Sequence, residues 1–170
     1  VLARYLAAAE QSSADIVVRV TSDCPLIDPA LVDETVKLYF GEGADYAANC
    51  CVDYLFPRGS EVEVFAAEAL RSIEPVAREP FERAHVTPYF YRHPERFKIA
   101  FLEAQGPYRR PDLRVCVDTR EDLDLVRAIY ERLDAGRNDF SILDVIEVMD
   151  REPGLKAINA HIHQKKLQEG

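Results

Sequence analysis

The stretch Asp15–Pro29, DIVVRVTSDCPLIDP, contains the pattern that decides the fold. Its run Ile16–Val20 is short, mostly apolar and β-branched, which predicts a strand buried on both faces in a parallel sheet. Asp28 and Pro29 predict a helix start, with Asp28 as N-cap and Pro29 at the first helical position. Because ligands of open α/β sheets bind beyond the carboxyl ends of the strands, Asp23 lies where chemistry is expected. The alternative is that Asp23 only closes the turn.

Length, composition and charge limit the class of protein. The chain has 170 residues, of which 48% are hydrophobic and 30% charged, and its formal net charge is −9 at pH 7. This mixture is typical of a soluble globular protein, and we interpret residues 1–170 as a single α/β domain. The acidic balance argues against broad contact with DNA or RNA, which requires a basic face. The acidic net charge does not exclude a nucleotide as ligand.

The four cysteines indicate the cellular compartment of the protein. Cys24, Cys50, Cys51 and Cys116 lie in no metal-ligand spacing, and the adjacent Cys50 and Cys51 are poor disulfide candidates. We therefore expect reduced, mostly buried thiols in a cytoplasmic protein. The sequence has no apolar run long enough to cross a bilayer and no signal-peptide pattern, so we expect no membrane partner.

Strand patterns alternate with helical patterns along the chain. The predicted strands are 16–20, 45–48, 61–65, 97–102 and 114–117. Helices are predicted at 1–10, 29–40 and 66–73, from Pro80 onward, and after capping boxes that begin at Thr119 and Ser141. This alternation predicts an α/β structure, a mostly parallel sheet with helices on both faces. The chain begins at Val1 inside a predicted helix, so we expect it to be N-terminally truncated.

Two of the predicted strands end in an aspartate. Ile16–Val20 leads to Asp23, and Arg114–Val117 leads directly to Asp118. If these strands are parallel neighbours, both carboxylates face the same crevice. Such a pair fits Mg²⁺, which takes few ligands from protein and the rest from water and phosphate. The alternative is a pair of aspartates that only close turns or cap helices.

Four segments, in this order, carry a family resemblance. They are SDCPLIDP (22–29), FPRGSEVEVF (56–65), FERAHVTPYFY (81–91) and VDTREDLDLVRAIYE (117–131). Together they resemble the cytidylyltransferase-like proteins of spore-coat polysaccharide biosynthesis, which are relatives of the CMP-KDO and CMP-sialic acid synthetases. The resemblance implies a Rossmann-like nucleotide-diphospho-sugar transferase fold, a Mg²⁺-dependent reaction with CTP and a sugar, and a homodimer.

The two aspartates fall on motifs of that family. Asp23 matches the Asp of the family's G-D-x-P segment, and Asp118 matches the first Asp of V-D-T-P-E-D-L. In the CMP-KDO synthetases these positions hold the metal, so the resemblance implies catalytic and metal-binding roles here. Ser22 stands where Gly is common, and Arg120 where Pro is common. Neither change removes a ligand, although Ser22 could shift the turn that carries Asp23.

The family's glycine- and arginine-rich loop, G-S-x-R-L-P-G-K, has no match in this sequence. In the family this loop wraps the triphosphate, because its backbone N–H groups and cations bind phosphate oxygens. We therefore expect this polypeptide alone to bind CTP poorly.

Further candidates lie in the segments where such enzymes hold the sugar. The predicted substrate-binding residues are Arg58, Glu61, Glu63, Arg83, His85 and Arg114. Arg58 could pair with a substrate carboxylate, or it could be a solvated loop arginine. Glu61 and Glu63 are predicted to share one strand face. If that face is covered, the two charges require partners such as Arg58 or Arg83, and if it is open they are surface residues.

The roles of His85 and Arg114 also have two interpretations. His85 shares a predicted helix face with Phe81 and Tyr89, where a lone histidine is more often a core residue than a catalyst. Arg114 belongs to a basic cluster with Arg109 and Arg110, which could meet pyrophosphate or only offset the acidic surface.

The sequence thus favours a CTP-dependent sugar nucleotidyltransferase that forms a CMP-sugar and pyrophosphate. In such a reaction catalysis depends on positioning and electrostatics, so a strong general base is not required. Two alternatives remain at this point. One is a glycosyltransferase that uses a sugar-nucleotide donor, and the other is a non-catalytic module for dimerisation or regulation.

Overall fold

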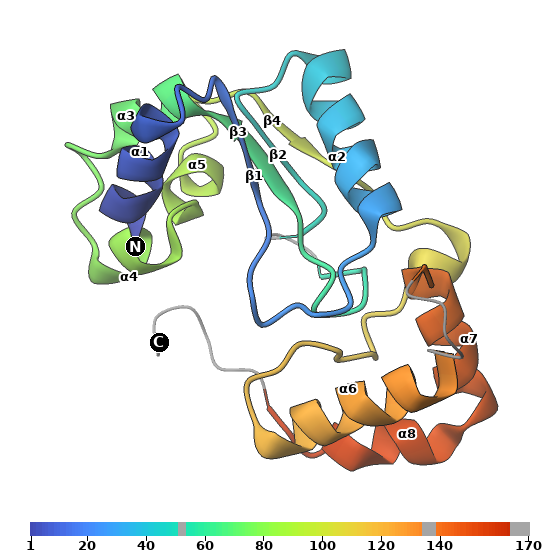
Figure 1. Cartoon of the computed structure of the whole chain (residues 1–170). Helices are drawn as coiled ribbons and strands as arrows, with labels where there is room; N and C mark the ends of the chain where they lie inside the picture. The colour runs from blue at the N-terminus through green and yellow to red at the C-terminus, as the bar shows by residue number, and fades with distance from the viewer. Residues whose placement is uncertain (51–53, 134–138, 164–170) are drawn as a thin grey trace.

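A computed structural model describes residues 1–50, 54–133 and 139–163 (Figure 1). One sheet has the strand order β1-β3-β2-β4. Its strands are β1 (Ile16–Arg19), β2 (Tyr46–Ala48), β3 (Glu63–Ala66) and β4 (Ile99–Phe101). Four of the five predicted strands are therefore present, each shorter than predicted. The expectation for Cys51 lies outside the described residues.

The sheet is mixed, so the prediction of a mostly parallel sheet needs correction. β3 runs antiparallel to both of its neighbours, with Val64 opposite Val18 of β1 and Ala47 of β2. β2 and β4 pair in parallel, with Tyr46 opposite Ile99. The alternating pattern of β3 specifies which side chains share a face, but it does not specify the direction of the strand.

The strand β1 lies at the edge of the sheet, and the prediction that both of its faces are buried was wrong. Val18 is 43% exposed, and Val20, just beyond the strand, is 42% exposed. A β-branched apolar run indicates a strand, but its burial depends on which elements cover it.

The predicted strand Arg114–Val117 is not a strand in the structure. This segment is extended and makes one parallel bridge, between Arg114 and Arg58. The Arg58 N–H donates to the Leu113 carbonyl over 2.9 Å, and the Val115 N–H donates to the Arg58 carbonyl over 2.7 Å. One bridge fixes the segment 113–117 beside the loop that contains Arg58.

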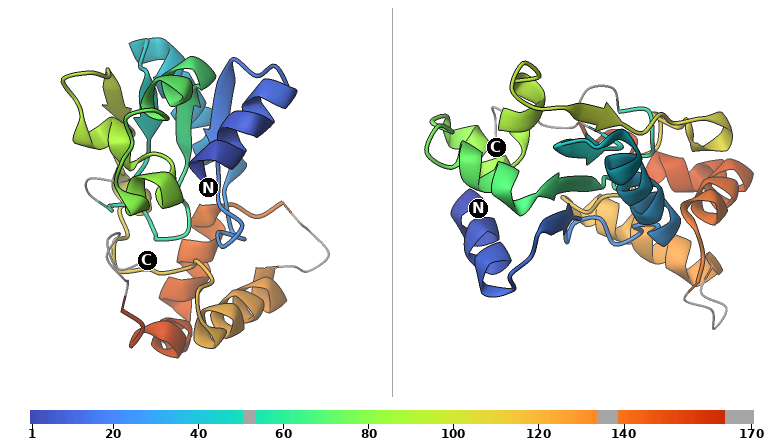
Figure 2. Two further views of the ribbon diagram at one scale, coloured as in Figure 1. Left: turned by 90° about the vertical axis from the view of Figure 1, so that its left-hand side faces the viewer. Right: turned by 90° about the horizontal axis from the view of Figure 1, so that it is seen from above.

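Helices cover both faces of the sheet, as predicted. On one side lie α1 (Leu2–Gln11), α3 (Ala67–Ile73), α4 (Pro80–His85) and α5 (Pro88–Arg92), and on the other lies α2 (Pro29–Glu42) (Figure 1). A 3₁₀ turn, η1 (Gly106–Tyr108), precedes a group formed by α6 (Arg120–Leu133), α7 (Ile142–Arg151) and α8 (Pro153–Asn159). Figure 2 shows this group beyond one end of the sheet. Within the described residues, none of these helices has the length and hydropathy needed to span a bilayer.

The sheet separates two hydrophobic cores. Tyr46 and Phe65 point into the core formed with α1, α3, α4 and α5. Ala47 and Val64 point into the other core, which continues through α2 to α6, α7 and α8. Because the second core is continuous, the C-terminal helices are packed against the sheet and hold the segment 113–119 in place.

Local signals for helix starts are confirmed. The Thr119 hydroxyl accepts the Asp122 N–H, and the Asp122 carboxylate accepts the Thr119 N–H, so α6 begins with the predicted capping box. Ser141 and Asp144 form the same reciprocal pair at α7. The helix predicted from Pro80 onward is interrupted before Pro88, which begins α5.

Asp28 joins two helix starts. Its Oδ1 accepts the Ala30 N–H of α2 over 2.8 Å, and its Oδ2 accepts the Ile142 N–H of α7 over 2.9 Å. The side chain is buried, at 3% exposure. One carboxylate therefore satisfies orphan N–H groups of two helices that are far apart in the sequence.

Gly59 allows the closest approach between the Arg58 loop and the segment 113–117. Its φ of +104° is in a region that favours glycine, and an added Cβ would lie 2.5 Å from the Cys116 backbone nitrogen. Only glycine fits both the backbone angle and the space.

Replacement of Asp28 by alanine is expected to lower the free energy of unfolding by about 2–3 kcal/mol, because it removes an N-cap and leaves the buried Ile142 N–H without a partner. Urea denaturation followed by circular dichroism measures the change. The exposed Asp33 on α2 provides the control, and Asp33→Ala should change stability by less than about 0.5 kcal/mol. Equal effects of the two substitutions would contradict the structural role of Asp28.

Replacement of Gly59 by alanine is expected to destabilise the fold by at least about 2 kcal/mol, because the backbone at Gly59 and Cys116 must move apart. The matched control is Gly154→Ala, where an added Cβ meets no atom within 4 Å and φ is not positive. That control should be neutral or slightly stabilising, since alanine is the better helix former. Wild-type stability of Gly59→Ala in urea would show that the approach is not as tight as described.

Candidate functional site

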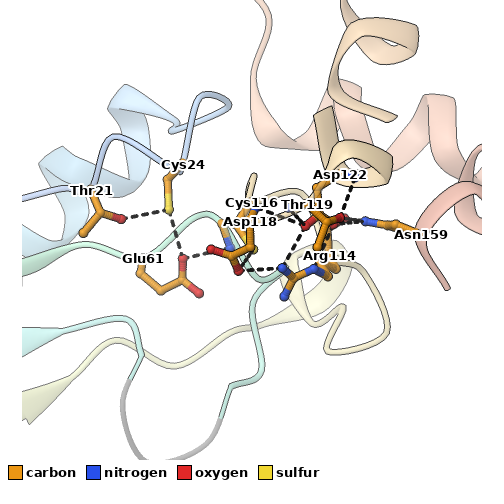
Figure 3. Close-up of polar contacts among 10 residues, drawn as sticks. Thr21, Cys24, Glu61, Arg114, Cys116, Asp118, Thr119, Asp122 and Asn159 are labelled. Atoms are coloured by element: carbon orange, nitrogen blue, oxygen red, sulfur yellow. Dashed lines mark hydrogen bonds and ion pairs between the residues drawn. The ribbon is translucent and has the colours of Figure 1, made fainter. Parts of the chain in front are cut away.

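The turns that carry Asp23 and Asp118 meet at the carboxyl end of β1. Asp23 lies in the turn after β1, and Asp118 lies just before α6. The Val117 N–H donates to the Asp23 carbonyl over 2.8 Å, so the backbone of one turn is bonded to the residue next to the other aspartate. The structure thus brings together two residues that the sequence analysis singled out. Figure 3 shows the polar contacts around this point.

Asp118 is held by Arg114. The Nη2 of Arg114 donates to Oδ2 of Asp118 over 2.6 Å. The Asp118 side chain is 48% exposed, whereas the Arg114 side chain is only 12% exposed. One carboxylate therefore faces solvent while its orientation depends on a guanidinium that is largely enclosed.

Arg114 is in turn held by Asp122, a buried carboxylate with no exposed surface. Nε and Nη2 of Arg114 each donate to Asp122 over 2.9 Å, a bidentate pair. Asp122 also accepts from Nδ2 of Asn159 and from the N–H groups of Asp118 and Thr119. Burial alone would raise the pKa of Asp122, but these donors outweigh it and hold the pKa well below its usual range.

A second carboxylate and two thiols lie on the other side of Asp118. Glu61 accepts the Gly59 N–H over 2.8 Å and the Cys24 thiol over 3.5 Å, and burial raises its pKa. The Cys116 thiol lies 3.9 Å from Oδ2 of Asp118. Burial raises the pKa of Cys116 to about 12, with Asp118 and Glu61 adding to the shift, so this thiol is neutral at pH 7.

The predicted state of the cysteines is confirmed where the structure describes them. Cys24, Cys50 and Cys116 are buried, and none of them forms a disulfide with another described residue. Burial raises the pKa of Cys24 strongly, and the nearby Glu61 raises it further. The Cys24 and Cys116 thiols are packing residues with weak donors, and their positions beside Glu61 and Asp118 make them poor nucleophiles.

The donor set at the two turns fits a hard divalent cation with incomplete protein ligation. Over residues 1–50, 54–133 and 139–163, no group of three His, Cys, Asp or Glu side chains is arranged to hold a metal ion by itself. Mg²⁺ is usually bound by one or two carboxylates together with water and substrate phosphates. Asp23 and Asp118 offer carboxylate oxygens of the required kind, and neither is buried.

Arg58 borders a cavity next to this cluster. Its guanidinium lies 4.1 Å above the ring of Tyr54 and lowers the pKa of Glu61 against the effect of burial. The cavity has a volume of about 270 Å³ and is also lined by Arg114, Lys156 and Asn159. Since the Arg58 guanidinium rests on an aromatic face, its N–H donors can meet an anionic group.

Glu63 is covered and fully engaged inside the protein. The hydroxyl groups of Tyr46 and Thr87 donate hydrogen bonds to its Oε1 over 2.6 and 2.5 Å. Arg19 forms an ion pair with its Oε2. The expectation that these glutamates require cationic partners was right: Arg19 pairs with Glu63, and Arg58 acts on Glu61. Arg83 pairs with Glu74 instead. Glu61 lies before β3, so the two glutamates do not share a strand face.

Arg83 and His85 lie on α4, which covers the other face of the sheet from α2. Arg83 pairs with Glu74 over 3.0 Å. His85 precedes Val86, whose φ of +75° and a Thr87 N–H···His85 carbonyl bond of 2.9 Å form a strained γ-turn. His85 Nε2 is buried and has no hydrogen-bond partner among the described residues. Among the residues that the structure describes, no hydrogen bond or ion pair links α4 to Asp23 or Asp118.

The predicted basic cluster is divided. Arg114 belongs to the site, whereas Arg110 pairs with Asp112 and Asp150, and Arg109 is exposed. The sequence analysis missed Arg19 and Asn159, which supply the partners of two buried carboxylates. No local signal could identify them, because each meets its carboxylate only through the tertiary fold.

Comparison with known proteins is consistent with this geometry. A sequence model of a family described as cytidylyltransferase matches residues 1–142. A cytidylyltransferase from Leptospira borgpetersenii has a similar solved structure, with a TM-score of 0.83 and 30% sequence identity. That likeness covers 97% of this chain and 67% of the Leptospira chain.

Two curated proteins are similar in sequence. The spore coat polysaccharide biosynthesis protein SpsF of Bacillus subtilis is 34% identical over 90% of this chain, and an uncharacterized protein of Methanocaldococcus jannaschii is 32% identical over 99%. The chain spans 62% and 67% of their respective lengths. Family model, relatives and structure agree, and the chain belongs to the cytidylyltransferase family of nucleotidyltransferase enzymes.

Proposed function

We propose that this chain carries the metal-binding and sugar-binding part of a CTP-dependent sugar nucleotidyltransferase, which forms a CMP-sugar and pyrophosphate. The relative SpsF is named for spore coat polysaccharide biosynthesis, and a surface polysaccharide is the destination that we propose for the activated sugar. The observation that supports this most directly is the hydrogen bond from the Val117 N–H to the Asp23 carbonyl, which joins the turns of two aspartates that are not buried.

The proposed reaction is a displacement at the α-phosphorus of CTP. A sugar hydroxyl oxygen forms a bond to that phosphorus, the bond to the oxygen that bridges to the β-phosphate breaks, and pyrophosphate leaves with the bond electrons. The hydroxyl proton passes to water. Asp23 and Asp118 would hold Mg²⁺, which would neutralise charge that develops on the phosphate oxygens.

The protein's own residues contribute position and charge. Arg114 orients Asp118, and the low pKa of Asp122 keeps that orienting pair ionised over the working pH range. Arg58 is proposed to receive an anionic group of the substrate, with the cavity beside it as the binding space. The roles of Glu61, Glu63, Arg83 and His85 in sugar binding stay predictions. For Glu63, sugar binding would require that its hydrogen bonds with Tyr46 and Thr87 and its ion pair with Arg19 break.

A homodimer and a cytoplasmic location are further parts of the proposal. They rest on the family resemblance and on the reduced cysteines. Light scattering of the purified protein measures the oligomeric state, and a monomeric mass at micromolar concentration would contradict the dimer.

Replacement of Asp118 by asparagine in the complete gene product is expected to lower Mg²⁺-dependent pyrophosphate release from CTP and sugar by at least about 100-fold, because a metal ligand loses its charge. A coupled pyrophosphate assay measures the rate. The control is Asp124→Asn, which removes a half-exposed carboxylate of α6 that pairs with Arg120 and Arg127 of the same helix. Normal turnover by the Asp118 variant would contradict the proposed metal site.

A further inference from the structure

We infer that Asn159, the last residue of α8, is a positioning residue for Asp118 and acts through Asp122 and Arg114. This inference rests on the proposed function, because it assigns Asn159 to the proposed metal site. Residues 1–142 match the family model, so α8 lies outside the matched part of the chain. The C-terminal helix is thereby assigned a part in the chemistry in addition to packing.

The first step is the placement of Asn159. The residue is buried, at 4% exposure, and its Nδ2 donates to Oδ1 of Asp122 over 2.8 Å and to the Arg114 carbonyl over 3.1 Å. One amide group therefore contacts both the carboxylate that orients Arg114 and the backbone of Arg114 itself (Figure 3).

The second step is the geometry of the guanidinium. Two of its N–H groups are directed at the two oxygens of Asp122, and Nη2 also donates to Asp118. Because the guanidinium is planar, fixing its contact with Asp122 also fixes the direction of the bond to Asp118. Any rotation of the Asp122 carboxylate would move that bond.

The third step concerns Asp118. Its side chain is 48% exposed, so packing contributes little to its orientation, and Arg114 is the charged group that holds it. Groups that orient a metal ligand without contacting the metal commonly change metal affinity by 10–100-fold when they are removed. Loss of the Asn159 amide should act at the lower end of that range, because Asp122 keeps its bonds to Arg114.

The alternative role for Asn159 is structural, as a hydrogen bond that ties α8 to α6. The two roles differ in what they affect. A purely structural bond changes the stability of the fold and leaves the metal affinity of the folded protein unchanged. A positioning residue changes the metal affinity even where the fold is intact.

The experiment measures the affinity of the complete gene product for Mn²⁺, used as a probe for Mg²⁺, by water-proton relaxation. Asn159→Ala is expected to weaken binding about tenfold. The matched control is Leu155→Ala, a buried residue of the same helix that belongs to the hydrophobic core and has no polar contact with Arg114 or Asp122. It should lower the urea midpoint at least as much as Asn159→Ala, with Mn²⁺ affinity within about twofold of wild type.

The outcomes separate this inference from the proposed function. If Asp118→Asn abolishes Mn²⁺ binding and Asn159→Ala binds as wild type does, the inference is overturned and the proposed metal site stands. If Asp118→Asn binds Mn²⁺ normally, the proposed metal site fails, and the inference fails with it. Asn159→Leu, which keeps the branched shape and the number of side-chain heavy atoms, replaces the alanine variant if that protein does not fold, and the same tenfold loss is expected.

Discussion

The buried carboxylate of Asp122 is the interaction on which the arrangement of the site depends. An ionised group without exposed surface is tolerated only when it is paired and hydrogen-bonded, and Asp122 meets this requirement with donors from three parts of the chain. It caps α6, it fixes Arg114, and it accepts the amide of Asn159. Each of these segments must keep its place, because removal of any one donor leaves the charge less well compensated.

A second constraint brings the other aspartate into the site. Gly59 lets the Arg58 loop approach the backbone of Cys116, and the Val117 N–H then reaches the Asp23 carbonyl. Two turns that are distant in the sequence are therefore joined by backbone contacts, which depend little on side-chain choice. This gives Asp23 and Asp118 a common location, and the solvent-facing Asp118 remains available to a cation and to substrate phosphates.

The helix starts could be predicted from the sequence because their signals are local. Asp28, the Thr119–Asp122 pair and the Ser141–Asp144 pair each act within one helical turn, and all three are confirmed. The direction of β3 and the missing strand at 114–117 could not be predicted, since hydrophobic alternation does not encode which strands become neighbours. The partners of Glu63 and Asp122 were missed for the same reason. Arg19 and Asn159 reach them only through tertiary contacts.

The central claim is that Asp23 and Asp118 bind one divalent cation. Anomalous diffraction from crystals of the complete gene product soaked with Mn²⁺ tests it most directly. Our account predicts a single strong peak about 2.0–2.6 Å from a carboxylate oxygen of each aspartate. A peak at only one of the two residues, or carboxylates that turn away from each other around an ion bound elsewhere, would contradict it.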